Sequence, residues 1–333
     1  MTRHILIIGA TGGSGAALAS ACIRQGWRVS GLTRRHVDDR PAASAIRWVQ
    51  GDAMEAADVL TAAQGADVIF HGANPPGYRD WAKTAPQMLQ NSIVAARAVG
   101  ARLILPGNIY NFGPDSFPVL HEGAPQNPVS VKGEVRRQME QMLDDACREG
   151  LRAIVLRAGD FFGPHAPASW LSNGMVRPGK APRVVRDPGT AGTGHAWAYL
   201  PDFAETVLRL LQVQDCLRDM EVIHMAGQWF DEGRDFARAV ARAGGVPGAK
   251  VKPLPWWIIS ALSPLVPLCR ELREMRYLWQ NSIALDNTRL RELIGSEPHT
   301  PLDDALRETM QGLGCIAESG DHLHSAASTP AAI

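Results

Sequence analysis

The 333-residue sequence lacks a run of apolar residues long enough to cross a membrane. Its most membrane-like stretch, residues 254–268, is interrupted by Pro264 and Pro267 and leads into Arg270-Glu271, whereas a span needs about 20 apolar residues. We therefore expect this stretch to form a buried or interface helix rather than a membrane-surface one. The apolar run at residues 5–8 is too short for a signal peptide, which favours a cytoplasmic protein.

The sequence also lacks an excess of charge of either sign and has few cysteines. Lys plus Arg and Asp plus Glu both number 34, so no overall basic field attracts nucleic acid or anionic lipid. The five cysteines are scattered, with no CxxC and no His-rich partner spacing, so neither disulfides nor a metal site are expected. A small-molecule substrate is the partner that remains, with a homodimer possible.

The first half of the sequence alternates short apolar runs with amphipathic helical stretches. Continuous apolar strands between helices are typical of a parallel sheet that is covered on both faces. The fold class predicted is α/β, a Rossmann-type doubly wound parallel sheet with a smaller, mostly C-terminal substrate lobe. The predicted strands are 5–8, 28–32, 46–50, 68–71, 103–105 and 153–156, and the predicted helices are 15–25, 56–63, 86–99 and 129–149.

The alternation of predicted strands and helices stops near residue 160, and we expect the chain to have three regions. Residues 1–160 form the dinucleotide-binding domain. Residues 161–315 are mixed segments that complete the sheet and form the substrate lobe. Residues 316–333 are small and polar, and we expect a disordered tail.

The strongest motif is GATGGSG at residues 9–15, directly after an apolar strand and at the start of an Ala-rich helix. Gly9 permits a tight turn and Gly12 lets the backbone approach a pyrophosphate, which the helix N-terminus attracts. Gly15 allows the helix to pack closely on the strand. The strand before the loop and the helix after it favour a dinucleotide site over a merely structural turn.

The GxxGxxG spacing resembles that of the extended short-chain dehydrogenase/reductase superfamily, which includes nucleotide-sugar epimerases and dehydratases. Weaker similarities follow in the family's order: Gly51-Asp52, His71-Gly72-Ala73, Asn91, the segment 157–164 and the segment 197–204. The loop and the resemblance together imply a nicotinamide cofactor. Its predicted binding residues are Gly9, Thr11, Gly12, Gly13, Ser14, Gly15, Arg34, Arg35, Asp52, Ala53, Gly72, Ala73, Asn91 and Lys132.

The end of the second strand favours NADP(H) over NAD(H). An NAD site needs a carboxylate there to accept both ribose hydroxyls, but this sequence has no acid before Asp38. Arg34 and Arg35 stand there instead, and guanidinium groups can bind a 2′-phosphate. The alternative is that both arginines belong to a solvated face.

The resemblance implies a catalytic Ser or Thr, a Tyr and a Lys, with the Tyr four residues before the Lys. Lys132 matches the lysine, but Pro128 stands at the tyrosine position, where Asn127 and Pro128 are expected to start the helix. In LPGNIYNFG, counting back from Tyr110 places Pro106 at the serine position. Neither proline can transfer a proton, so the family's proton relay is not expected here.

Four residues remain as catalytic candidates: Lys132, Tyr110, Asn108 and Asp160. Lys132 holds the nicotinamide ribose or acts as an acid, and the amide of Asn108 can polarise a carbonyl. Tyr110 is equally a packing residue. The sequence therefore predicts an NADP(H)-dependent oxidoreductase or isomerase that acts on a small carbonyl or hydroxyl substrate with a non-standard proton donor. The alternative is a catalytically degenerate NADP(H)-binding sensor or scaffold.

Overall fold

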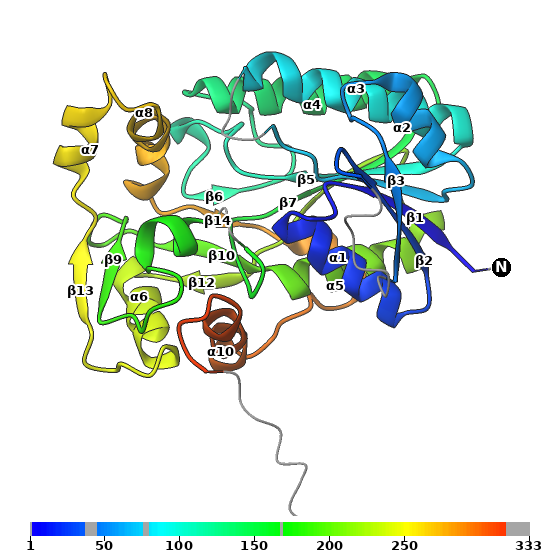
Figure 1. The fold of residues 1–333 in the computed structure, drawn as a ribbon. Helices are drawn as coiled ribbons and strands as arrows, with labels where there is room; N and C mark the ends of the chain where they lie inside the picture. Colours follow the sequence, from blue (N-terminus) through cyan, green and yellow to red (C-terminus); the bar gives the residue numbers. More distant parts are fainter. Residues whose placement is uncertain (1, 37–44, 76–79, 167–168, 318–333) are drawn as a thin grey trace, which may run out of the picture.

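A single parallel sheet of seven strands forms the centre of the computed structural model, which describes residues 2–36, 45–75, 80–166 and 169–317 (Figure 1). The strand order is β11-β7-β5-β4-β1-β2-β3, so the chain runs outward from β1 in both directions. All six predicted strands are present and the predicted fold class is confirmed. The strands are β1 His4–Ile8, β2 Arg28–Thr33, β3 Ile46–Gln50, β4 Val68–His71, β5 Arg102–Gly107, β7 Arg152–Arg157 and β11 Met220–His224.

Helices cover both faces of this sheet, as a continuous apolar strand pattern requires. On one face lie α2 (Ala56–Ala63), α3 (Trp81–Val99) and α4 (Val131–Arg148), and on the other α1 (Gly13–Arg24) and α5 (Leu200–Gln212), joined by α9 (Thr288–Ile294) (Figure 1). Each face buries its own apolar cluster against the strands. The C-terminal ends of the strands are thereby left as the edge at which ligands of open α/β sheets bind.

A smaller lobe lies beyond that edge. Three strands form its main sheet. A two-stranded sheet and several helices pack with it around a separate hydrophobic core that contains many aromatic side chains. Its elements are β8 Asp160–Phe162, β10 His195–Tyr199, β12 Gln228–Phe230, β9 Val184–Asp187, β13 Lys250–Pro253, α6 Gly233–Ala243, α7 Trp256–Leu262, α8 Pro267–Glu274 and α10 Leu302–Gly312. A short parallel pair, β6 (Val119–Leu120) and β14 (Ala284–Leu285), connects the lobe to the loop after β5.

The start of α4 differs from the predicted start. The helix begins at Val131, and its N-cap is Ser130, whose hydroxyl accepts a hydrogen bond from the backbone N–H of Gly133 at 3.0 Å. Asn127 and Pro128 therefore precede the helix, and the prediction that they start it is wrong. A serine hydroxyl that accepts a hydrogen bond from the backbone N–H three residues later caps the start of a helix better than the Asn-Pro pair does. Lys132 consequently lies in the first turn.

The stretch 254–268 contains the short helix α7 and the start of α8. Of the two predicted alternatives, the buried helix is wrong for most of its side chains, since those of Trp257 and Leu265 are 75% and 83% exposed, and the interface helix stays a prediction. Pro264 lies between the two helices, and Pro267 is in the first turn of α8, where proline is compatible with a helix start. None of the helices in the described ranges has the length and hydropathy to cross a bilayer. Most of the predicted tail, residues 318–333, lies outside the described residues.

Candidate cofactor and substrate site

The glycine loop forms a cradle at the end of β1 that has no room for side chains. Gly9 has φ of +93°, and a Cβ on it would lie 2.6 Å from the carbonyl carbon of Gly72 in the loop after β4. A Cβ on Gly15 would lie 2.3 Å from the carbonyl oxygen of Gly9. The N-cap of α1, Gly12, has no side-chain cap, so the first backbone N–H groups of the helix face the loop. This backbone fits a pyrophosphate, whose charge the helix N-terminus favours.

The loops after β3 and β4 are fixed beside the cradle. The amide of Asn91 on α3 donates to the carbonyl of Ala53 at 2.8 Å, and Gly72 N–H donates to Ile8 O at 2.8 Å. Asp52 accepts a hydrogen bond from Met54 N–H at 3.0 Å. Asn91 is buried and holds the loop 51–54 in place, so its observed role is to position that loop.

Arg34 and Arg35 follow β2 at the same edge of the sheet, and both side chains are exposed. The backbone N–H of Arg35 donates to the hydroxyl of Thr33 at 3.2 Å, and Thr33 O accepts from Gly51 N–H at 2.9 Å. The turn that carries the two arginines is thus connected to the loop after β3. The structure leaves both guanidinium groups in solvent, where a phosphate can reach them.

Lys132 lies in the first turn of α4 and is held by the lobe. Its ammonium group is 2.7 Å from the carboxylate of Glu271 on α8, and its side chain is only 9% exposed. Glu274, one turn further along α8, accepts hydrogen bonds from the backbone N–H groups of Val131 at 2.5 Å and Lys132 at 3.3 Å. A carboxylate at a helix N-terminus is favourable because it meets the positive end of the helix dipole. Sequence reasoning missed both glutamates, since they are about 140 residues away along the chain.

The two prolines that the sequence analysis singled out lie on either side of α4. Pro106 is near the end of β5, and its carbonyl accepts a hydrogen bond from Arg136 at 3.3 Å. Pro128 packs against the first turn, where a Cβ on Gly133 would lie 2.7 Å from the Pro128 Cβ. The guanidinium group of Arg136 also lies over the ring of Trp81, 5.7 Å from its centroid. Arg136 follows Lys132 by one helical turn, a spacing that places both side chains on one face.

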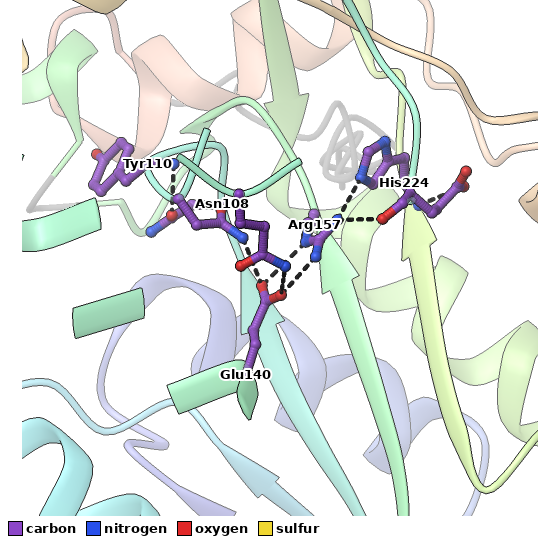
Figure 2. Close-up of polar contacts among 8 residues, drawn as sticks. Asn108, Tyr110, Glu140, Arg157 and His224 are labelled. Carbon is purple, nitrogen blue, oxygen red and sulfur yellow. Dashed lines mark hydrogen bonds and ion pairs between the residues drawn. The ribbon is translucent and has the colours of Figure 1, made fainter. Parts of the chain in front are cut away.

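A buried ion pair lies behind these residues, between Arg157 at the end of β7 and Glu140 on α4 (Figure 2). Two parallel contacts join them, Nη2 to Oε2 at 2.5 Å and Nε to Oε1 at 3.0 Å. Asn111 and Gln126 donate further hydrogen bonds to Glu140 at 3.2 and 3.0 Å. Arg157 also donates to Glu122 O at 3.1 Å. Such a bidentate, fully hydrogen-bonded pair fixes the relative position of strand, helix and loop.

His224 at the end of β11 completes this network (Figure 2). Its Nε2 is 3.0 Å from Arg157 Nη1, which can only donate, so Nε2 is the acceptor and Nδ1 carries the proton toward Leu120 O at 3.1 Å. Burial, with the Arg157 charge beside it, lowers the pKa of His224 to about 3. The imidazole is therefore neutral at physiological pH and acts as a structural member of the network.

The remaining candidates divide between the two parts of the molecule. Asn108 Oδ1 accepts a hydrogen bond from Tyr110 N–H at 3.0 Å, and the Tyr110 ring is directed away from Arg157 (Figure 2). Asp160 in the lobe sheet lies 2.7 Å from Nε2 of His195, whose ring stacks on Trp279 with centroids 4.0 Å apart. Asn108 and Tyr110 are thus neighbours at the end of β5, whereas Asp160 is paired within the lobe. We expect all four candidates to face one nicotinamide, since they are at or near the C-terminal ends of strands, and this stays a prediction.

Comparison with known proteins gives one family. Residues 5–226 match the NAD dependent epimerase/dehydratase family. A Streptomyces protein described as 3-diazoavenalumate denitrifying reductase is 30% identical over 176 residues, which cover 48% of this chain and 57% of that protein. The chain thus aligns with little more than half the length of this curated relative.

Solved structures of sugar-nucleotide enzymes share the fold. A UDP-glucuronic acid 4-epimerase from Bacillus cereus, in complex with UDP-glucuronic acid and NAD, has a TM-score of 0.71 at 15% identity and covers 93% of this chain and 99% of its own. A dTDP-glucose 4,6-dehydratase from Streptomyces venezuelae, with NAD bound, has a TM-score of 0.70 at 17% identity and covers 93% and 96%. At these identities the likeness establishes the architecture alone.

Proposed function

Because the chain belongs to the NAD dependent epimerase/dehydratase family, we propose that it is an NADP(H)-dependent oxidoreductase that reduces a small electrophilic substrate without the family's serine–tyrosine proton relay. The observation that carries this proposal is a glycine loop with room for a pyrophosphate, combined with prolines at positions 106 and 128. Gly9, Gly12 and Gly15 keep the backbone free of side chains where a pyrophosphate binds. Pro106 and Pro128 occupy the positions at which the family resemblance places the proton-transferring hydroxyls.

When it is bound, NADPH supplies a hydride, and this step requires no nucleophile from the protein. The contribution of the protein is to bind, orient and polarise. Lys132 and the amide of Asn108 are the groups we assign to polarising the substrate oxygen or another developing negative charge. Epimerisation at a sugar carbon would instead require a base that removes a hydroxyl proton, which neither proline provides. Reduction therefore fits this site better than epimerisation does.

The choice of cofactor rests on the turn after β2. Arg34 and Arg35 are exposed there, and the connected loop after β3 contains Asp52, whose carboxylate accepts a hydrogen bond from Met54 N–H. A 2′-phosphate has two guanidinium partners within this turn, whereas a bare ribose has no carboxylate directly after β2. The named activity of the Streptomyces relative, a reductase, agrees with the proposed direction of the reaction.

The second candidate function is an NADP(H)-binding sensor or scaffold without turnover. The ion pair between Lys132 and Glu271 favours it, because one hydrogen of the lysine ammonium is already engaged by the lobe. A lysine ammonium group has three donors, however, so its contact with one carboxylate does not prevent it from binding a ribose or a substrate. Binding of NADPH is expected under both candidates and does not separate them.

Consumption of NADPH in the presence of a panel of acceptors tests the proposed function. The panel contains an aryl diazo acid, a ketone, an enone and a UDP-hexose. We expect oxidation of NADPH with at least one of the first three and none with the sugar nucleotide. Tight binding of NADPH with no oxidation by any acceptor would support the scaffold, and epimerisation of the UDP-hexose would contradict the proposal.

A further inference from the structure

The elements α7, α8, β9 and β13 lie together at one edge of the lobe (Figure 1). They carry exposed apolar and basic side chains. Six large apolar side chains in 12 consecutive positions, which we call the apolar ridge, are exposed by 37% to 83%. The ridge consists of Trp257, Ile258, Leu262, Leu265, Val266 and Leu268. Scattered exposed apolar residues are normal on a protein surface, but a contiguous group of this size marks an interaction site.

A basic strip lies on the paired strands β9 and β13, and β13 directly precedes α7 in the chain. In the parallel pair of β13 and β9, Lys250 is opposite Val184 and Lys252 is opposite Arg186, so their side chains share one face. All four are exposed, as is Arg183 just before β9. The strip, which we define as Arg183, Arg186, Lys250 and Lys252, is joined to α7 by the hydrogen bonds Leu254 N–H to Asp187 O (2.7 Å) and Trp256 Nε1 to Pro188 O (2.9 Å).

The acidic residues of these four elements are turned inward. Asp187 is 6% exposed, and burial raises its pKa. Glu271 pairs with Lys132, and Glu274 binds the backbone N–H groups at the start of α4. Arg270 and Arg273 on α8 remain exposed. The outward charge of this edge is therefore positive, although the whole chain is balanced at 34 charges of each sign.

We propose that the apolar ridge and the basic strip dock this protein on the surface of an anionic lipid bilayer. Trp and Leu side chains on a short amphipathic segment enter the boundary between headgroups and acyl chains, and neighbouring Lys and Arg side chains attract anionic headgroups. The most exposed residues, Trp257 and Leu265, protrude from the edge, which suits insertion into a soft interface better than packing against a flat protein surface. The equal numbers of positive and negative charges in the whole sequence argued against binding to anionic lipid. They do not reveal the local surplus of positive charge at this edge.

This docking mode does not depend on the proposed reaction. It requires no membrane span, in agreement with the short helices α7 and α8. It also preserves the contacts of Glu271 and Glu274 with α4, since five of the six ridge residues precede α8. A second copy of the chain is the alternative occupant of the ridge, and it would be recognised by a change in oligomeric state.

Co-sedimentation of the full chain with vesicles tests this proposal. Vesicles of phosphatidylcholine with phosphatidylglycerol are compared with vesicles of phosphatidylcholine alone. We expect binding to the anionic vesicles only, weakened at least about tenfold by the double change Trp257→Asp, Leu265→Asp, and similarly by Arg186→Glu, Lys252→Glu, because each lost charge contact and each lost apolar contact lowers the affinity severalfold.

Matched changes outside this edge serve as controls. Val94 and Val119 are each 45% exposed, so Val94→Asp, Val119→Asp introduces the same two carboxylates at exposed apolar positions elsewhere, and Arg28→Glu, Arg47→Glu reverses two exposed charges near the opposite end of the sheet. Both controls are expected to bind like the parent. The proposal is overturned if the parent protein does not bind anionic vesicles, or if the control changes weaken binding as much as the edge changes do. It is also overturned if size-exclusion chromatography shows that the parent is a dimer and that only the ridge variant is not.

Discussion

The ammonium group of Lys132 lies 2.7 Å from the carboxylate of Glu271, and this contact joins the first turn of α4 to the lobe helix α8. The lysine side chain is 9% exposed, so its ammonium group is held between the helix and the lobe. The residue that the family resemblance assigns to catalysis is therefore positioned in part by the lobe.

Replacing this lysine separates the two candidate functions. Lys132→Met is expected to lower the turnover number by at least about 100-fold, since loss of one preorganised donor typically has that effect. NADPH binding, measured by fluorescence titration, should weaken much less. Lys180→Met removes an exposed lysine of the lobe and is the control. Full activity of Lys132→Met would point to a function without chemistry at this residue.

The two arginines after β2 are expected to determine cofactor preference. Changing Arg34 and Arg35 together to Ala should weaken NADPH binding by about 1.5–3 kcal/mol per lost charged contact, because each arginine binds the 2′-phosphate through charge-assisted hydrogen bonds. NADH binding should hardly change. Calorimetric titration of parent and variant with both cofactors provides the comparison. Identical affinities of the parent for NADPH and NADH would rule out this assignment.

The cradle should not tolerate a single methyl group. Gly15→Ala places a Cβ 2.3 Å from Gly9 O, so the loop must move away from α1. We expect NADPH binding to fall below detection and the melting temperature to drop. Gly123→Ala is the matched control, since nothing lies within 4 Å of its added Cβ. Cofactor binding by Gly15→Ala equal to that of the control would show that the pyrophosphate lies elsewhere.

Two buried histidines should make the protein sensitive to acid. Burial lowers the pKa values of His71 and His224 from 6.5 to about 3, so between these values the unfolded chain binds protons that the folded chain does not. The free energy of unfolding should therefore fall as the pH falls from about 6.5 to 3, by up to about 1.4 kcal/mol per pH unit for each histidine. It should be insensitive to these groups above pH 6.5.

Urea unfolding of the parent and of His71→Gln across this pH range provides the measurement. His71 is chosen because its Nδ1 pairs with Ser92 at 2.8 Å while, in the described part of the chain, its Nε2 has no hydrogen-bond partner. The variant should be less stable at pH 7 and show a shallower dependence on pH. Parallel curves for the two proteins would contradict the assignment of His71 as a neutral group.

The fold was predictable because its signals are local. Apolar runs such as residues 5–8 and 68–71 mark buried parallel strands wherever they occur, and GATGGSG marks the turn between the first strand and its helix. Lys132 was singled out for a similar reason, since the family resemblance depends on its spacing from Pro128 along one segment, and its role stays a prediction.

The partners of these residues were not predictable, because they come from distant segments. Glu271 and Glu274 reach α4 from the lobe, and Glu140 meets Arg157 across a strand and a helix. The start of α4 was misplaced because Asn127-Pro128 and Ser130 are both good helix-start signals, and the sequence does not show that the Ser130 hydroxyl makes the cap. The choice between a buried and an interface helix at Trp257 stayed open, since apolar content alone does not tell a buried helix from a surface one.

Transfer of deuterium from C4-deuterated NADPH to an acceptor tests the central claim most directly, which is that hydride transfer occurs here with proline at position 128. The parent is expected to give a deuterated product at the rate of NADPH oxidation. Pro128→Tyr should bind NADPH normally and transfer deuterium no faster, because Pro106 leaves a restored phenol without its hydroxyl partner. The claim would be contradicted if the parent bound NADPH but transferred no deuterium to any acceptor of the panel while Pro128→Tyr did.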